Sequence, residues 1–304
     1  MKIATTIGEM YPWVASPAEA VRAYEGTGFR FLDYSFYSAN SSGSVFLTDR
    51  WMEQVEAAGE AAAALGFTFV QAHSPNYNPF HDENDVSYHE AGMLATIRSI
   101  EACGRLGIPN IVVHTAYGPR CQYPEDAEKY FRENMPFLEA LYPAMEKWNV
   151  RVCIENSAEG NMGKNYFFMT AEDMNAFLDF AGHPLLGACW DTGHGNMRGT
   201  DPYHELVTLG SRLHAVHFQD NGGMADEHTA PFFGTLSVDA VMRGLLDAGY
   251  RGPLTFESDN FLRYRKNRVD GPLQYPPLRV KRASLVLLHE LGAAALEAYG
   301  IPED

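Results

Sequence analysis

Six acidic or histidine residues directly follow short apolar runs, and all six are residue types that bind metal ions. A lone polar residue at such a place is more often a capping group, but six in succession are hard to attribute to chance. The runs and their closing residues are FVQAH (His73), IVVH (His114), VCIE (Glu155), ACWD (Asp191), HAVH (His217) and TFE (Glu257).

If these residues meet, three carboxylates lie close together, and burying them without a cation is very costly. The pattern therefore predicts a divalent metal ion. Histidine and carboxylate ligands without cysteine suit Mn²⁺ or Zn²⁺, with Mg²⁺ and Co²⁺ as alternatives.

Two glycine-containing loops add further candidates. The stretch GACWDTGHGN (187–196) either holds its histidine in an ordinary polar turn or directs Asp191 and His194 toward a shared ligand. The stretch HFQDNGGMADEH (217–228) contains Asp220, Asp226 and His228. The D-x-H spacing lets Asp226 and His228 point the same way in an extended segment. We expect this pair either to reach the metal region or to be solvated, and we expect Asp220 to be solvated.

Short β-type runs alternate with helical patterns along the chain. Helix starts are marked by Ser16 before Pro17 and by Ser237, and a helix end by Gly66. Eight strand–helix units favour an α/β fold with one (β/α)8 TIM barrel domain over residues 1–304. A doubly wound sheet is the alternative, but its G-x-G-x-x-G after the first strand is absent. The expected strands cover residues 2–7, 29–35, 67–73, 110–115, 150–156, 185–191, 213–220 and 253–258.

Composition narrows the function classes. The 304 residues carry a formal net charge of −16, which argues against a large nucleic-acid surface. No apolar stretch reaches membrane-spanning length, so we expect no membrane partner and a cytoplasmic location. The four cysteines lack C-x-x-C spacing and are expected to be free thiols rather than metal ligands. A homo-oligomer is compatible with the sequence.

Taken together, these residues resemble the sugar phosphate isomerase/epimerase group of the xylose isomerase-like TIM barrels. The resemblance covers essentially the whole chain and is carried by VVHTA, CIENSAEG, WDTGH and HFQDN…DEH…FGTLSVDAVMRGLLDAGYRGPLTFE. It implies one divalent ion bound by Glu155, Asp191, His217 and Glu257. It also implies proton transfer through an enediolate between Glu155 and Glu257, on a small polyhydroxylated keto compound such as a sugar, sugar phosphate or inosose.

The same resemblance leaves other functions open. Endonuclease IV, the abasic-site nuclease, shares the site plan, and its ligand set for three zinc ions has a counterpart here at every position: His73, His114, Glu155, Asp191, His194, His217, Asp226, His228 and Glu257. In the isomerase reading, His194 and His73 contact substrate. A lyase or dehydratase, or a metal-binding barrel without activity, would show the same residues. Ketose 3-epimerases carry an arginine six residues after the metal histidine, and here that residue is Gly223.

Two further features have competing interpretations. The basic stretch FLRYRKNR (261–268) is expected to be a solvated loop, with a phosphate clamp or a partner surface as alternatives. Trp13, Phe36, Tyr37 and Trp190 are either an apolar wall over a sugar or simple packing.

Overall fold

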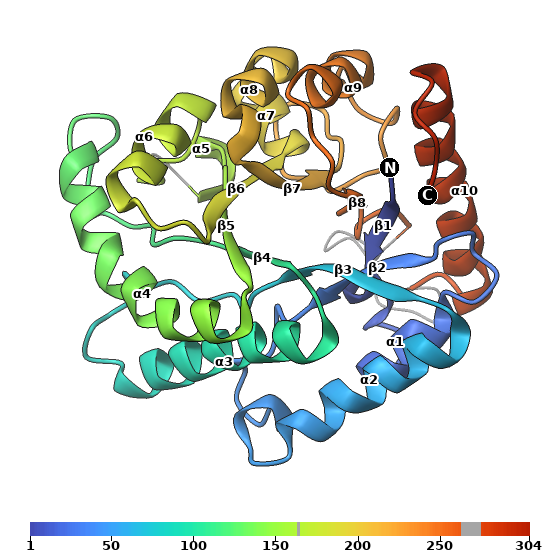
Figure 1. Cartoon of the computed structure of the whole chain (residues 1–304), viewed down its shortest axis with the longest axis horizontal. Coiled ribbons are helices and arrows are strands. Elements are labelled where there is room, and N and C mark those ends of the chain that lie inside the picture. The colour runs from blue at the N-terminus through green and yellow to red at the C-terminus, as the bar shows by residue number, and fades with distance from the viewer. Residues whose placement is uncertain (163–164, 263–274) are drawn as a thin grey trace.

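Eight parallel strands form a closed barrel in the order in which they occur along the chain. The computed structural model describes residues 1–162, 165–262 and 275–304. The last strand pairs with the first, since Ala4 lies opposite Thr255, and this closure is visible in Figure 1. The strands are β1 (Ile3–Thr6), β2 (Phe31–Ser35), β3 (Thr68–His73), β4 (Asn110–Val113), β5 (Arg151–Glu155), β6 (Leu186–Asp191), β7 (Leu213–Phe218) and β8 (Leu254–Phe256).

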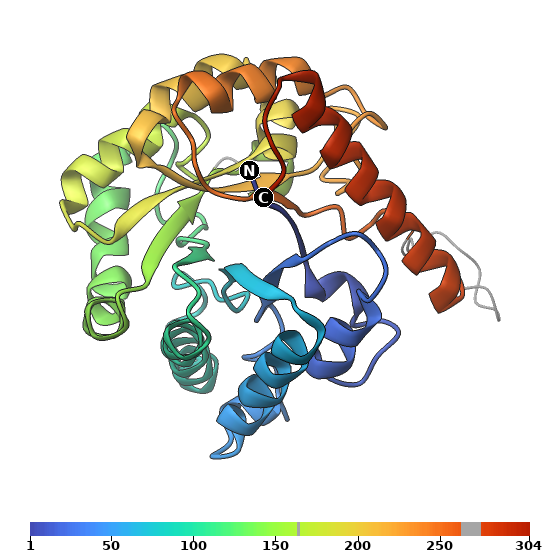
Figure 2. The same ribbon diagram turned by 45° about the vertical axis from the view of Figure 1, so that its right-hand side comes forward.

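Helices surround the barrel and pack their apolar faces against the strands (Figures 1 and 2). The α-helices are α1 (Pro17–Ala23), α2 (Trp51–Leu65), α3 (Val86–Leu106), α4 (Ala127–Trp148), α5 (Glu159–Met162), α6 (Ala171–Ala181), α7 (Thr192–Arg198), α8 (Pro202–Leu209), α9 (Val238–Asp247) and α10 (Leu278–Ala298). Short 3₁₀ turns are η1 (Ile7–Met10), η2 (Val45–Leu47) and η3 (Gly210–Arg212). The fold is therefore the predicted (β/α)8 TIM barrel.

The predicted helix ends follow local hydrogen-bonding rules. The hydroxyl of Ser16 accepts a hydrogen bond from the amide of Glu19 at the start of α1, and Ser237 does the same for Ala240 in α9. Gly66 ends α2 with φ of 73°, a left-handed conformation that suits glycine. The hydroxyls of Ser16 and Ser237 thus provide hydrogen-bond acceptors for amides that have no partner within the helix.

The observed strands are shorter than predicted by one or two residues at several ends. The sequence places His114 inside the fourth strand, but β4 ends at Val113 and His114 follows it directly. Glu257 likewise lies just beyond β8, and β7 continues one residue past His217. All the candidate groups nevertheless stand at the carboxyl ends of the strands, where barrel enzymes hold their active sites.

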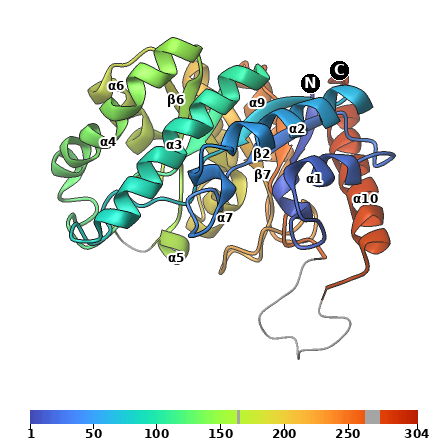
Figure 3. The same cartoon turned by 90° about the horizontal axis from the view of Figure 1, so that it is seen from below.

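The barrel interior is arranged in layers. Val112, Cys153, Cys189 and Ala215 come from four neighbouring strands and form their own fully buried cluster. Because side chains two residues apart share a face of a strand, residues two positions later point into the carboxyl end, and residues two positions earlier point into the amino end. Figure 3 shows the barrel from the side, with the N-terminus at one end and α5 at the other.

No helix in the part of the chain that the structure describes is long and apolar enough to cross a membrane. All four cysteines are buried free thiols, as predicted.

Candidate metal centre

Four side chains from neighbouring strands converge at the carboxyl end of the barrel. Glu155 ends β5, Asp191 ends β6, His217 lies near the end of β7, and Glu257 follows β8. One ligand atom from each lies within 4.8 Å of those of the other three. Glu155, Asp191 and His217 are buried, whereas Glu257 is partly exposed. The separation fits a shared ion, so these four residues remain our candidate ligand set.

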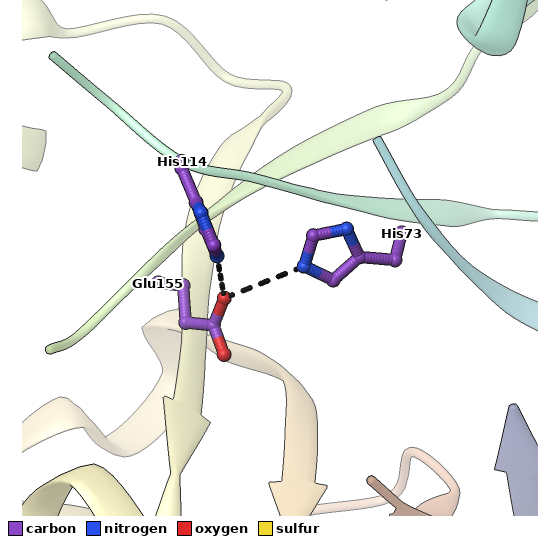
Figure 4. A group of neighbouring side chains, drawn as sticks. All are labelled: His73, His114 and Glu155. Atoms are coloured by element: carbon purple, nitrogen blue, oxygen red, sulfur yellow. Dashed lines mark hydrogen bonds and ion pairs between the residues drawn. The ribbon is translucent and has the colours of Figure 1, made fainter. Parts of the chain in front are cut away.

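Glu155 is the centre of this group. Its Oε1 lies 2.6 Å from His217 Nδ1, and its Oε2 lies 2.6 Å from His114 Nε2. His73 Nε2 approaches the same Oε2 at 3.8 Å, so two histidines point at one carboxylate oxygen (Figure 4). His217 Nδ1 also lies 3.1 Å from Glu257 Oε2. The two glutamates are therefore linked through one imidazole.

The electrostatics of the group favour ionised glutamates. Burial raises the pKa of Glu155, but His217 and His114 outweigh it and hold that pKa well below its ordinary value. Burial opposes ionisation of Glu257 as well, yet His217 and His228 lower its pKa to about 2. By contrast, burial raises the pKa of Asp191 to about 7, against the opposing effect of His194. A cation beside Asp191 would remove this penalty.

Asp191 has a second role as the N-cap of α7. Its Oδ1 accepts a hydrogen bond of 2.7 Å from the backbone amide of His194. The turn expected after Asp191 is therefore the start of a helix, and His194 lies in its first turn. The cap orients the Asp191 carboxylate and the His194 side chain together.

His194, Asp226 and His228 form a second group of candidate ligands, also with ligand atoms within 4.8 Å of one another. Asp226 Oδ2 lies 3.0 Å from His228 Nε2 and 3.4 Å from His194 Nε2. Although burial opposes it, these two imidazoles lower the pKa of Asp226. The D-x-H pair thus turns toward the site rather than into solvent.

Asp220 differs from its prediction. It is fully buried, and its carboxylate accepts hydrogen bonds from the amides of Asn221, Gly234 and Leu236. Asp220 therefore fixes the loop that follows β7 instead of facing solvent.

The residues present fit a divalent cation. The carboxylates and imidazoles supply the oxygen and nitrogen donors that Mn²⁺ and Zn²⁺ accept. No lysine or arginine lines this cavity in the described ranges, so imidazoles alone offset the acidic charge. A third group of candidate ligand atoms joins Cys189 to Glu155 and His217. Burial, however, raises the pKa of the Cys189 thiol well above its ordinary value, which disfavours the thiolate that a metal needs.

A cavity of about 550 Å³ opens above the cluster. His73, His114, His194, His228 and Glu257 line it, together with polar groups that include Asn76, Tyr117 and Asn161. This volume is ample for a small polar ligand.

Of the two interpretations of the four aromatic residues, simple packing holds for three. Trp190 and Phe36 are buried in the core, and Trp13 contacts the ring of Tyr275. Tyr37 alone among the four lines the cavity. Residues 263–268 of the basic stretch lie outside the described residues, so its role remains a prediction.

Sequence reasoning missed the groups that orient the ligands. Gln219 Nε2 donates to both carboxylate oxygens of Asp191 at 3.1 and 3.3 Å, and to Asp226 Oδ1 at 3.0 Å. The side chain of Asn156 bonds both backbone polar groups of Asp191. Asn156 directly follows Glu155 in IEN, and Gln219 lies two residues after His217 in HFQ, which is the only signal that the sequence offered.

Asp33 on β2 was also missed. It is buried, and neither carboxylate oxygen has a hydrogen-bond partner among the residues that the structure describes. Burial raises its pKa to about 6 despite His217 and His73. A charged residue within the apolar run FRFLDYS was its signal.

Solved structures share this fold. The chain aligns with a D-tagatose 3-epimerase-like protein with a TM-score of 0.74 and 17% identity, covering 98% of each chain. It aligns with D-psicose 3-epimerase from Clostridium cellulolyticum H10, solved with D-tagatose, with a TM-score of 0.70, 18% identity and full coverage of both. The 3-keto-D-glucoside 4-epimerase YcjR from E. coli gives a TM-score of 0.69 and 18% identity over 95% of this chain and 99% of that one.

Two curated relatives match part of the chain, and both carry the name of uncharacterized proteins. Uncharacterized protein y4fM of Sinorhizobium fredii is 26% identical over 67% of this chain, and uncharacterized protein MJ1311 of Methanocaldococcus jannaschii is 26% identical over 60%. Each match spans 63% of the relative's own length. The family model for the xylose isomerase-like TIM barrel matches residues 21–273. The chain therefore belongs to the xylose isomerase-like TIM barrel family.

Proposed function

We propose that the protein is a divalent-metal-dependent isomerase or epimerase of a small keto-sugar, a sugar phosphate or an inosose-like compound. The observation that carries the proposal is the pairing of two glutamates, Glu155 and Glu257, in one group of candidate metal ligands beneath an open polar cavity. The sugar epimerases among the structural neighbours support the same class of substrate. The four buried free thiols suit a reducing compartment such as the cytoplasm.

Glu155, Asp191, His217 and Glu257 would hold the ion. When bound, a divalent cation polarises a substrate carbonyl and stabilises the negative charge of an enediolate. The low pKa values of Glu155 and Glu257 favour an ionised carboxylate that can act as the base. The ionised glutamate would accept the proton from the carbon next to the carbonyl. The other glutamate has to be protonated at that stage and would deliver its proton to the opposite face.

His194 is assigned to substrate binding. Its Nδ1 lies 2.9 Å from the backbone carbonyl oxygen of Asn156, which directs Nε2 toward Asn161 and Asp226. His194 lines the cavity, and an imidazole in this position can donate a hydrogen bond to a substrate oxygen. His73 is placed similarly beside Glu155.

The test is a panel of ketoses, inososes and their phosphorylated forms incubated with the protein in deuterated water. Proton transfer through an enediolate predicts deuterium at the carbon next to the carbonyl, and loss of this exchange after chelation and dialysis. Absence of exchange on every compound, with metal bound, would contradict the proposal.

The second candidate is an abasic-site nuclease. The observation in its favour is the additional ligand-type group formed by His194, Asp226 and His228 beside the first. Chelator-sensitive cleavage of an abasic DNA duplex would replace the isomerase proposal.

A further inference from the structure

A second cavity, of about 630 Å³, lies at the amino end of the barrel, opposite the candidate metal centre. Its walls come from the starts of β3, β4, β5 and β7, and from the loop that leads into β8. In Figure 3 this is the end at which the N-terminus lies. Among the described residues, the two cavities have no lining residue in common.

The lining of this cavity is basic. It contains Lys2, Arg151, Arg251 and His214, and none of its described lining residues is Asp or Glu. This is unusual in a chain with 39 acidic and 23 basic residues and a net charge of −16. The first cavity has the opposite character, with four acids and no lysine or arginine in its described lining. The two ends of the barrel thus differ in charge.

Arg151 is the central group. It starts β5, four residues before Glu155, so its side chain takes the same inward face at the other end of the strand. Its Nε is buried without a hydrogen-bond partner, and no ion pair to Arg151 occurs among the residues that the structure describes. A buried guanidinium nitrogen without a partner is costly, and an anion would satisfy it.

Two features of neighbouring strands make room for this arginine. A Cβ added at Gly187 on β6 would lie 2.9 Å from Arg151 Cδ and 2.6 Å from His214 Cδ2, so only glycine leaves this space free. The pairing of β6 with β7 shifts register, since Ala188 pairs with Leu213 but Cys189 pairs with Ala215. The shift leaves His214 unpaired between them, and its side chain lies over Gly187 beside Arg151.

The remaining cations are also free of acidic partners within the described ranges. The ammonium of Lys2 lies 5.2 Å from the ring centre of Phe31, and Arg251 donates a long hydrogen bond of 3.4 Å to the Tyr250 carbonyl oxygen. Burial and the nearby Arg151 lower the pKa of His214 to about 4, so this imidazole is neutral near pH 7 and can still donate or accept a hydrogen bond.

We propose that this cavity binds a small ligand that carries a phosphate group. Arginine side chains match the geometry of phosphate oxygens with paired N–H donors, and Lys2 adds a point charge. The volume exceeds what a single anion fills, which leaves space for an organic part beside the phosphate. This binding does not depend on the proposed isomerase activity.

The experiment measures thermal unfolding of the full chain against increasing inorganic phosphate and, separately, glycerol 3-phosphate, with ionic strength held constant by chloride. Ligand bound to the native state raises Tm in a concentration-dependent way. Replacement of Arg151 or Arg251 by glutamine removes a charge-assisted hydrogen bond, and the apparent affinity should fall about tenfold or more. Tighter binding of the ester identifies a phosphorylated metabolite, whereas equal binding identifies phosphate itself.

The matched control is Arg132→Gln, an exposed arginine on α4 that is paired with Glu128. This variant should keep the wild-type shift. Arg251 is exposed, so Arg251→Gln tests the proposal even if Arg151→Gln fails to fold. A crystal soaked in selenate should show anomalous density beside Arg151. The proposal is overturned if phosphate causes no shift in the wild type, if Arg251→Gln and Arg132→Gln respond equally, or if selenate appears only at the carboxyl end.

Discussion

Replacing Glu155 or Glu257 by glutamine tests the proposed proton transfer most sharply. Glutamine keeps the size of the side chain but cannot accept the substrate proton. Loss of a positioned general base or acid lowers kcat by about 10²–10⁴-fold, which corresponds to about 3–5 kcal/mol of transition-state stabilisation. Because His217 contacts both carboxylates, at 2.6 and 3.1 Å, either substitution also removes one of its two acidic partners.

The assay combines turnover with deuterium exchange and metal content. Substrate conversion gives kcat and KM, and exchange from deuterated water reports proton abstraction even if product release is slow. Metal content, measured on the same samples, separates loss of the ion from loss of the base. We expect turnover to be lost in both variants, including samples that are saturated with metal, and exchange to be lost in the variant that lacks the base for the substrate supplied.

The matched control is Glu205→Gln. Glu205 is a buried glutamate whose Oε2 accepts a hydrogen bond of 2.6 Å from the amide of Ala171, away from the cavity. Glutamine retains an oxygen for this bond, so the control should keep near-native turnover. Near-native kcat in Glu155→Gln or Glu257→Gln, with metal bound, would refute the acid and base assignment.

Three further predictions follow from contacts around and below the site. Gln219→Met should weaken metal binding about 10–100-fold, because the Asp191 carboxylate loses the hydrogen bond from Gln219 Nε2. Competition with a chelating dye measures the affinity, and an unchanged value would contradict this role. Burial lowers the pKa of His217, but Cys189 and the glutamates outweigh it and raise that pKa, so a metal ion must displace a proton. Calorimetry in buffers of different ionisation enthalpy should therefore show proton release on metal binding, and binding should weaken at lower pH. Heats that do not depend on the buffer would contradict this. Lys281→Met should lower the free energy of unfolding, measured with denaturant, by about 3–5 kcal/mol, because it leaves Glu9 buried without its cationic partner. Adding Glu9→Gln should recover much of this loss. Equal stability of the single and double variants would contradict the prediction.

The barrel was predictable because its signals are local. Apolar runs of strand length, Ser16 and Ser237 at helix starts, and Gly66 at a helix end each depend on a few adjacent residues. The convergence of the strand ends was predictable from the fold itself, because a parallel barrel brings the carboxyl ends of its strands to one rim.

Features set by distant contacts were not predictable. Lys281 on α10 donates to Glu9 Oε2 at 2.8 Å across 272 positions of sequence, and no local pattern marks that pair. The sequence left Trp190 open between a cavity wall and core packing. Adjacent residues of a strand point to opposite faces, so Asp191 faces the site while Trp190 enters the core. The basic cavity depends on a register shift at His214, which only the paired strands reveal.

Anomalous diffraction from crystals grown with Mn²⁺ and collected at its absorption edge tests the central claim most directly. The account predicts a peak between the side chains of Glu155, Asp191, His217 and Glu257, within coordination distance of all four. A peak bound elsewhere, or no peak at saturating Mn²⁺ and Zn²⁺, would contradict it.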